Sequence, residues 1–467
     1  MFHMEKNTLQ NGSQREVFGS KFGILAAAAG SAIGLGNIWK FPYITGENGG
    51  AAFILVYLIC IAFIGLPVML SEFLIGRRSQ KAAVGSFKVL KPGTPWFLTG
   101  WAGLLAAFFI LSFYGVVAGW TLNYIVWSVS NHLGGVTPDE VGAAFGGFIS
   151  DPVKPIIWQV IFMILTAAIV YGGVKKGIER YSKILMPLLL AIIVVLIVRS
   201  LTLPGASAGV DFLLSPDFSS LTAKGVLVAL GHAFFSLSLG MGTMITYGSY
   251  MGKEQSLGSM ALQVTVADTV IALLAGLAIF PAVFAFGLSA DAGPGLVFVT
   301  LPNVFNSMPG GPIFSTLFFL LLAVAALTSA ISILEVVVAF FVEELKLKRH
   351  IATIVAFVSI TIVGVLCSLS MSPASPVSSW LLPTLAGPKN FFDTMDWWSA
   401  NMFLPLGGLF IVLFAGWVMK EKDVRDEVSN GGSLNIPWFK AFQVAARFIA
   451  PIMILIVFLW SIGVLKI

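Results

Sequence analysis

Charged side chains are scarce in this sequence, and their scarcity decides the class of protein. Asp, Glu, Lys and Arg make up 10% of the 467 residues, against about 25% in soluble globular proteins. The hydrophobic share is 57% and the mean hydropathy is +0.94. These values exclude a soluble domain and are typical of a membrane protein with several spanning helices.

Cysteine and histidine are also few. Cys60 and Cys367 both lie inside apolar runs, which excludes a disulfide framework and a cysteine-based metal cluster. The four histidines are scattered, and no hydrolase motif surrounds them. The pair His232 and Ser236, four residues apart, leaves an intramembrane hydrolase as a remote alternative. The basic residues lie in short loops rather than in one patch, so no nucleic acid is indicated, and no feature indicates an obligate protein partner.

Long apolar runs recur along the chain, and a helix of about 20 apolar residues crosses a bilayer. We predict an all-α polytopic membrane protein. Its eleven helices are expected at about residues 20–45, 50–76, 97–130, 155–172, 178–200, 223–252, 257–287, 313–346, 350–370, 397–420 and 438–465.

Basic residues are concentrated in alternate loops, after the second, fourth, sixth, eighth and tenth predicted helices. They are Arg77, Arg78, Lys81, Lys88, Lys91, Lys175, Lys176, Arg180, Lys183, Lys253, Lys346, Lys348, Arg349, Lys420, Lys422 and Arg425. Because an excess of Lys and Arg marks cytoplasmic loops, we predict a multi-pass protein of the plasma membrane. Its N-terminus would be cytoplasmic and its C-terminus extracellular.

Residues 30–37, Gly-Ser-Ala-Ile-Gly-Leu-Gly-Asn, lie in the middle of the first predicted helix. Gly loses backbone entropy in a helix, and Asn offers the backbone a competing hydrogen bond. Unpaired backbone groups are costly in hydrocarbon, so a break survives where it lines a cavity within the protein. We therefore predict a broken helix at a binding site. The alternative is a seam of small residues for close helix packing.

Residues 235–242, Phe-Ser-Leu-Ser-Leu-Gly-Met-Gly, interrupt the sixth predicted helix in the same way. This break comes five helices after the first, so the two broken helices would run in opposite directions. Matching breaks in two halves indicate an inverted repeat with the substrate between them. We predict a single transporter domain over residues 1–467. Its parts would be a first repeat at about 15–200, a second at about 223–420 and an extra helix at about 438–465.

Residues 30–42, which continue as Ile-Trp-Lys-Phe-Pro, and the Glu-Asn-Gly-Gly of residues 47–50 resemble the first-helix signature of the neurotransmitter:sodium symporter family. The similarity extends through Gly65-Leu66-Pro67, Glu72, Tyr114, Gly177-Ile178-Glu179-Arg180, residues 234–242, Leu327-Thr328-Ser329 and Asp396. The resemblance implies the LeuT fold, with five helices in each inverted repeat, broken helices 1 and 6, and an extra helix 11. An eleven-helix chain is similar to the bacterial amino-acid transporters of that family.

The resemblance implies two sodium ions that are transported with the substrate. The first would be bound by the substrate carboxylate and by oxygens of Ala32, Asn37, Ser236 and Asp268. The second would be bound by the carbonyls of Gly30, Ile33 and Ala325 and the hydroxyls of Thr328 and Ser329. All-oxygen ligands suit a hard monovalent cation. The alternative for the two hydroxyls is hydrogen bonding within their own helix.

Asp268 is a carboxylate in the middle of a predicted helix, where charged groups usually serve ions, protons or pairing. In chloride-dependent members of the family, the resemblance places chloride at the positions of Tyr57, His232, Ser236, Asp268 and Ala272. We infer that the charge of Asp268 replaces chloride and makes the protein chloride-independent. Two alternatives stay open: Asp268 could pair with His232, or it could carry a proton in a proton-coupled amino-acid transporter of the same fold. The hydroxyls of Thr328 and Ser329 argue against proton coupling.

The resemblance also implies a substrate that brings its own carboxylate, because monoamine transporters of the family carry Asp where this chain has Gly34. The carboxylate would meet the amides of Leu35 and Gly36 and the Tyr114 hydroxyl. The ammonium would meet Ser238 and the carbonyls of Ala32 and Phe235. The side-chain pocket would be lined by Ile110, Phe235, Met241 and Ile333, each of which could equally be ordinary core. Flexible Met241 favours large or varied apolar side chains, so we expect aromatic and branched aliphatic L-amino acids.

Two pairs of charged residues would form gates on either side of the site. Lys40, just outside the first break, would pair with Asp396 at the start of the tenth helix. Arg15 would pair with Glu343 on the inner side, with Tyr250 nearby. The alternative is that these are solvated charges at helix ends, since exposed pairs contribute little.

Overall fold

The computed structural model describes residues 16–290, 293 and 295–465. Helices dominate this part of the chain, which holds one isolated β-bridge, between Leu382 and Lys389. In the first half, the elements are α1 (Lys21–Ala32), η1 (Gly36–Lys40), α2 (Phe41–Glu47), α3 (Ala51–Cys60), η2 (Ile61–Gly65), α4 (Leu66–Ser79), α5 (Ala83–Leu90), α6 (Phe97–Val129), α7 (Pro138–Ser150), α8 (Lys154–Tyr171), η3 (Val174–Glu179) and α9 (Arg180–Leu201).

The second half continues with α10 (Ser207–Leu214), α11 (Ala223–Ser236), α12 (Thr243–Gly248), α13 (Leu257–Ala285), η4 (Leu296–Thr300), α14 (Leu301–Ser307), α15 (Gly311–Glu343), α16 (Arg349–Ser370), η5 (Pro376–Ser379), α17 (Phe391–Trp398), η6 (Ser399–Phe403), α18 (Leu404–Leu413), η7 (Phe414–Val418), α19 (Glu421–Val428), α20 (Phe439–Val444), η8 (Ala445–Ile449) and α21 (Ala450–Ser461). Apart from η5, which is a 3₁₀ turn, the η elements are π-helical turns, most of which continue an α-helix without interrupting it.

The apolar runs form the helices that the sequence predicts. Among the described residues, nine helices are long and apolar enough to cross a membrane, and α1 with Gly36–Glu47 makes a tenth that is bent by 47°. The predicted sixth helix is present as two short pieces, α11 and α12, on either side of the second break. Both predicted interruptions are therefore real breaks in the helices.

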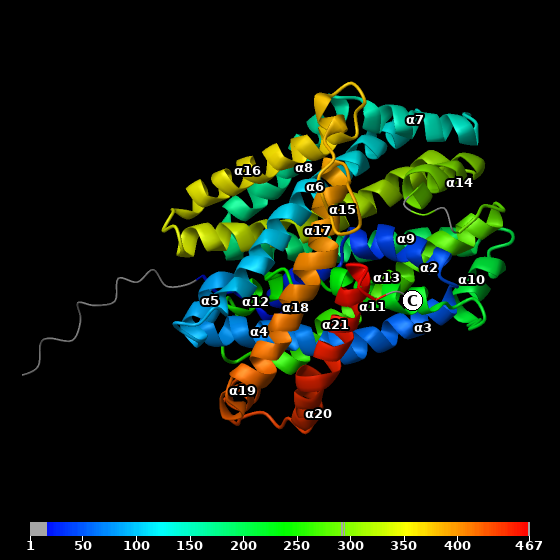
Figure 1. The fold of residues 1–467 in the computed structure, drawn as a ribbon. Coiled ribbons are helices and arrows are strands. Elements are labelled where there is room, and N and C mark those ends of the chain that lie inside the picture. The colour runs from blue at the N-terminus through cyan, green and yellow to red at the C-terminus, as the bar shows by residue number, and fades with distance from the viewer. Residues whose placement is uncertain (1–15, 291–292, 294, 466–467) are drawn as a thin grey trace, which may run out of the picture.

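The broken helices lie inside the bundle. The long helices α6 and α15 pack along each other at its centre, α1 contacts α15, α13 and α9, and α12 contacts α4 and α15. In Figure 1, α18 and α21 run side by side across the front, with α11 next to α21. The unwound segments at residues 33–35 and 237–242 are consequently surrounded by other helices. This is the one place where irregular backbone is tolerated at membrane depth.

The tenth predicted helix begins earlier than expected. The sequence predicts a start at about residue 397 with Asp396 at the beginning of the helix, but α17 begins at Phe391 and Asp396 lies inside it. The reason is a cap: the Asn390 side chain accepts a hydrogen bond from the Asp393 N–H at 2.8 Å. The prediction follows apolar runs, which Asp393 and Asp396 interrupt here, and so it does not use this cap.

Candidate functional site

The first break begins where α1 ends. Ile33 leaves the helical region with φ −74° and ψ 99°, and the Asn37 N–H donates to the Gly34 carbonyl rather than to that of Ile33. The Asn37 side chain closes the turn, because its Oδ1 accepts from the Gly34 N–H at 3.1 Å. The Leu35 N–H donates to the Tyr114 hydroxyl at 3.2 Å. The break thus leaves the Ile33 carbonyl without the hydrogen bond that a continuous helix would give it.

In the second break, every other residue from Ser238 to Gly242 is left-handed. Ser238, Gly240 and Gly242 have φ values of 53°, 80° and 77°, a region that glycine enters without steric cost. The Ser238 hydroxyl donates to the Ser31 carbonyl at 2.8 Å, so the second break contacts the last turn of α1, directly before the first break. On the other side, the Gly240 N–H donates to the buried Glu72 carboxylate at 2.7 Å.

Asp268 joins both breaks from α13. Its Oδ1 accepts from Asn37 Nδ2 at 2.8 Å, and its Oδ2 accepts from the Ser236 hydroxyl at 2.9 Å. Asp268 and Asn37 are both fully buried. The structure therefore brings together the three side chains that the sequence predicts for the first sodium site.

The residues predicted for the second sodium site also converge. The Ser329 hydroxyl lies 3.3 Å from the Gly30 carbonyl and 3.4 Å from that of Ile33. The Thr328 hydroxyl lies 3.5 Å from the Ile33 carbonyl and 3.0 Å from that of Ala325. The Thr328 hydroxyl also donates to the Val324 carbonyl of its own helix. Its position is therefore compatible both with a sodium ligand and with hydrogen bonding within the helix. Five oxygens from α1 and α15 gather here, and such a donor set fits a hard cation.

The predicted substrate residues surround the first break. Ile110, Tyr114, Met241 and Ile333 are buried, and the Phe235 ring lies against Gly36, where an added Cβ would be 3.4 Å from it. A Cβ on Gly34 would collide with the Ser329 hydroxyl and lie 2.9 Å from the Tyr114 hydroxyl. Leu35 and Ala32 complete this buried group. A larger side chain at position 34 would therefore have to displace Ser329 and Tyr114.

Of the two predicted gates, the outer one can be compared with the structure. No ion pair within 4.0 Å joins Lys40 to Asp396, both of which are described; the Lys40 ammonium lies over the Phe235 ring, 4.4 Å from its centroid. Arg15 lies outside the described residues. Glu343 accepts a hydrogen bond from the Ala82 N–H at 2.8 Å.

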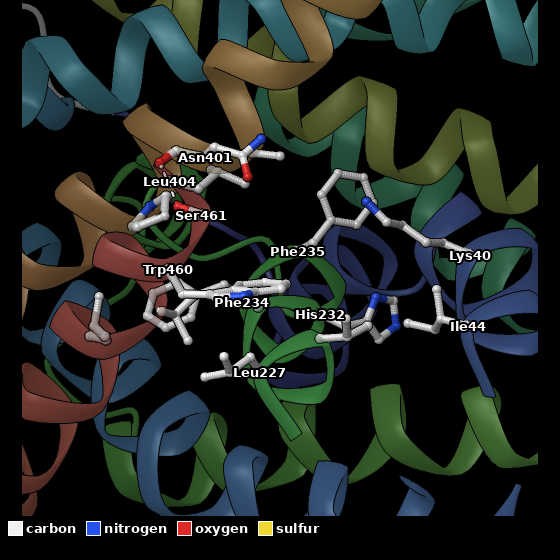
Figure 2. Close-up of a pocket in the computed structure, with 16 residues that line it drawn as sticks. Lys40, Ile44, Leu227, His232, Phe234, Phe235, Asn401, Leu404, Trp460 and Ser461 are labelled. Carbon is white, nitrogen blue, oxygen red and sulfur yellow. Dashed lines mark hydrogen bonds between the residues drawn. The ribbon is translucent and has the colours of Figure 1, made fainter. Parts of the chain in front are cut away.

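Beside Phe235 and Lys40 lies a cavity of about 150 Å³ between α2, α11, α18 and α21. Figure 2 shows the end of the Lys40 side chain next to the Phe235 ring on the right of the cavity, with Trp460 and Leu404 on the left. His232 also lines it, and neither ring nitrogen has a hydrogen-bond partner in the described structure. The Ser236 hydroxyl is turned to Asp268 instead. The structure therefore joins His232 neither to Ser236, as a hydrolase needs, nor to Asp268, as the alternative for that carboxylate required.

An ionic cluster that the sequence does not predict lies on the side of α1's N-terminus. Tyr250 donates to Glu335 Oε1 at 2.6 Å, and Arg349 pairs with Glu335 Oε2 at the same distance. Glu335 is fully buried in α15, and an intramembrane carboxylate is by itself a signal of function.

Tyr57 and Ala272, two of the residues at the predicted chloride positions, are buried as well.

Comparison with known proteins gives consistent matches. The sequence model of the sodium:neurotransmitter symporter family matches residues 15–138 and 149–466. An uncharacterized sodium-dependent transporter of Bacillus subtilis, YhdH, is 43% identical over 447 residues, which cover 96% of this chain and 98% of that protein. A sodium-dependent transporter of Haemophilus influenzae is 36% identical, with 96% and 98% covered. The crystal structure of MhsT in complex with L-phenylalanine superposes with a TM-score of 0.87 at 50% identity, covering 96% of this chain and all of the other.

Proposed function

This chain belongs to the sodium:neurotransmitter symporter family, and we propose that it imports hydrophobic L-amino acids together with sodium by alternating access. Membership makes it a multi-pass, sodium-dependent membrane transporter with the LeuT fold, and not an enzyme. The substrate class, the number of sodium ions, chloride independence and the cytoplasmic placement of the N-terminus are the proposed part.

The observation that carries the proposal is the contact between the two broken helices at their breaks. The Ser238 hydroxyl donates to the Ser31 carbonyl in the last turn of α1. Asp268 links the other sides of the two breaks, because it accepts from both Asn37 and Ser236. A substrate at this junction would change the packing of both half-helices at once. Such a contact couples binding to the rearrangement of both repeats.

Substrate recognition would start at Gly34. The Ser329 and Tyr114 hydroxyls lie close to its α-carbon, and glycine offers no acidic side chain to neutralise a substrate amine. The Tyr114 hydroxyl, held by the Leu35 N–H, is placed to donate its proton to a substrate carboxylate. The side chain would lie among Ile110, Met241 and Ile333 under the Phe235 ring. MhsT, with 50% identity, is known in complex with L-phenylalanine, which supports an aromatic or branched aliphatic amino acid.

Sodium would act as a co-substrate at two sites. The first combines the Asp268–Asn37–Ser236 group with the substrate carboxylate, and the second lies between Gly30, Ile33, Ala325, Thr328 and Ser329. Each ion that enters through a potential of about 100 mV supplies roughly 2.3 kcal/mol. Because Asp268 already places a carboxylate beside Ser236, no chloride would be needed.

Charged residues would close the entrances on both sides of the site. Lys40 lies over Phe235, so its ammonium would close the outer entrance through a cation–π contact. In another conformation of the transport cycle, Lys40 would pair with Asp396. On the inner side, Tyr250, Glu335 and Arg349 would add to the predicted pair of Arg15 and Glu343. A single lysine is a point charge without the fork of arginine, so the outer closure is expected to be easily reversed.

Equilibrium binding of tritiated L-phenylalanine to the purified protein tests the substrate assignment. L-Tryptophan and L-leucine should displace the label in sodium, whereas phenethylamine, which is phenylalanine without its carboxylate, should not. Tyr114→Phe should weaken L-phenylalanine binding by roughly tenfold, since a hydrogen bond to a charged group is lost. Displacement by phenethylamine as strong as that by L-tryptophan would refute the role of the carboxylate.

A further inference from the structure

A hollow of about 460 Å³ lies beside the N-terminus of α1, away from the site described above. It is lined by Gly19, Lys175, Glu179, Arg180, Lys183 and Ile184. Three of these side chains are cations and one is a carboxylate. The hollow thus joins the segment before α1 to the π-turn η3 and the first turns of α9.

The carboxylate in the hollow holds the first turn of α1. Glu179 Oε2 accepts from the Gly19 N–H at 2.6 Å, and Oε1 accepts from the Ser20 hydroxyl at 2.8 Å. Ser20 is the N-cap of α1 and accepts from the Gly23 N–H. Lys183 Nζ lies 2.5 Å from Glu179 Oε1, and the Glu179 side chain is 5% exposed. Glu179, the last residue of η3, therefore holds the N-terminus of α1, and Lys183 of α9 balances its charge.

The other two cations are free to take a ligand. Lys175 and Arg180 are exposed, and within the described residues neither has an ion-pair partner within 4.0 Å. Directly after them along α9, Tyr181, Ile184 and Leu188 are 43%, 56% and 40% exposed, as befits a surface that faces lipid. The cations thus lie at the membrane–water interface, where the phospholipid headgroups are.

We propose that this hollow binds the phosphate of an anionic phospholipid, with Lys175, Arg180 and Lys183 as its ligands. Arg and Lys are the residues that bind phosphate through charge-assisted hydrogen bonds. The exposed apolar face of α9 favours a lipid over a soluble phosphate, because the acyl chains gain a surface to lie on.

Bound phosphate would compete with Glu179 for Lys183. The carboxylate would then keep the Gly19 and Ser20 donors but lose its cation, and its hold on the first turn of α1 would weaken. α1 also carries the Gly30 carbonyl that contacts Ser329. The lipid composition of the membrane would in this way set how readily α1 moves, whatever the transported substrate is.

Lipid binding is measured by native mass spectrometry of the purified protein titrated with phosphatidylglycerol. The double variant K175Q/R180Q should bind about thirty-fold more weakly, since each cation contributes roughly fivefold. The matched control K420Q/K422Q removes two exposed cations from the loop before and the start of α19 and should bind as the wild type does. Equal weakening in both variants would show non-specific attraction and overturn the proposal. Equal occupancy with inorganic phosphate alone would show a soluble-anion site and overturn the lipid assignment.

The effect on α1 is measured by amide hydrogen exchange of residues 19–24 in nanodiscs. Exchange should be faster in phosphatidylglycerol than in phosphatidylcholine for the wild type, and equal in both lipids for K175Q/R180Q. An unchanged rate in the wild type would refute the competition for Lys183. Neither experiment requires transport, so a failure here is distinct from a failure of the proposed symport.

Discussion

Replacing Gly34 by Ala probes the centre of the proposed site with one methyl group. Gly34 does not have a positive φ, so alanine is compatible with its backbone. The added Cβ would collide with the Ser329 hydroxyl and would lie 2.9 Å from the Tyr114 hydroxyl and 3.1 Å from Ser329 Cβ. The methyl group therefore displaces one side chain proposed for sodium and one proposed for the substrate carboxylate.

The magnitude follows from overpacking. Inserting a methyl group into a filled interior costs about 1–3 kcal/mol, and every 1.4 kcal/mol is tenfold in affinity. If the strain falls on the ligand-binding conformation, Gly34→Ala should weaken L-phenylalanine binding between about fivefold and about 140-fold. The concentration of sodium that gives half-maximal binding should rise as well, because Ser329 must move.

The assay is equilibrium binding of tritiated L-phenylalanine over a range of sodium concentrations. Gly147→Ala in α7 is the matched control, because its Cβ would have no atom within 4 Å, and it should bind as the wild type does. Wild-type affinity and wild-type sodium dependence in Gly34→Ala would refute the placement of substrate and sodium around this residue.

Three further changes give sharp expectations. Thr328→Ala should raise the half-maximal sodium concentration roughly tenfold, since a hydroxyl ligand is lost, whereas Thr166→Ala, which removes a hydroxyl bonded within its own helix, should not; equal effects would refute the second sodium site. Asp268→Asn should abolish substrate binding without chloride and regain part of it when chloride is added; binding that ignores chloride would refute the charge-replacement argument. Gly76→Ala should lower the free energy of unfolding by about 3 kcal/mol, because its Cβ would overlap the Ile245 carbonyl oxygen, and unchanged thermal melting in detergent would contradict that close approach.

The helices and their two breaks could be predicted because the signals are local. Long apolar runs mark the spans, and Gly, Ser and Asn in the middle of two such runs mark the breaks. The π-turns such as η2 and η7 have no comparable signal, since a change of helical winding is decided by packing. The start of α17 was missed although its Asn390 cap is a local signal, because the apolar criterion took precedence.

The candidate site could be assembled from the sequence only through the family resemblance. Asn37 and Asp268 are 231 positions apart, and no local pattern predicts that their side chains meet. The direction of a side chain is harder still to predict from the sequence. Lys40 lies over the Phe235 ring and makes no ion pair with Asp396, because a long lysine side chain can turn to several neighbours. Glu335, in contrast, was visible as a carboxylate in an apolar run. Its partner Arg349 begins α16, after the loop that follows α15, so helical geometry alone does not predict their pairing.

The most direct test of the central claim is uptake into proteoliposomes under one gradient at a time. Radiolabelled L-tryptophan and L-leucine are added outside with an inward sodium gradient at equal pH, or with an inward proton gradient in the absence of sodium. The account predicts accumulation in the sodium gradient, with or without chloride, and none in the proton gradient alone. Accumulation driven by protons without sodium would contradict it, and Asp268 would then be the proton carrier.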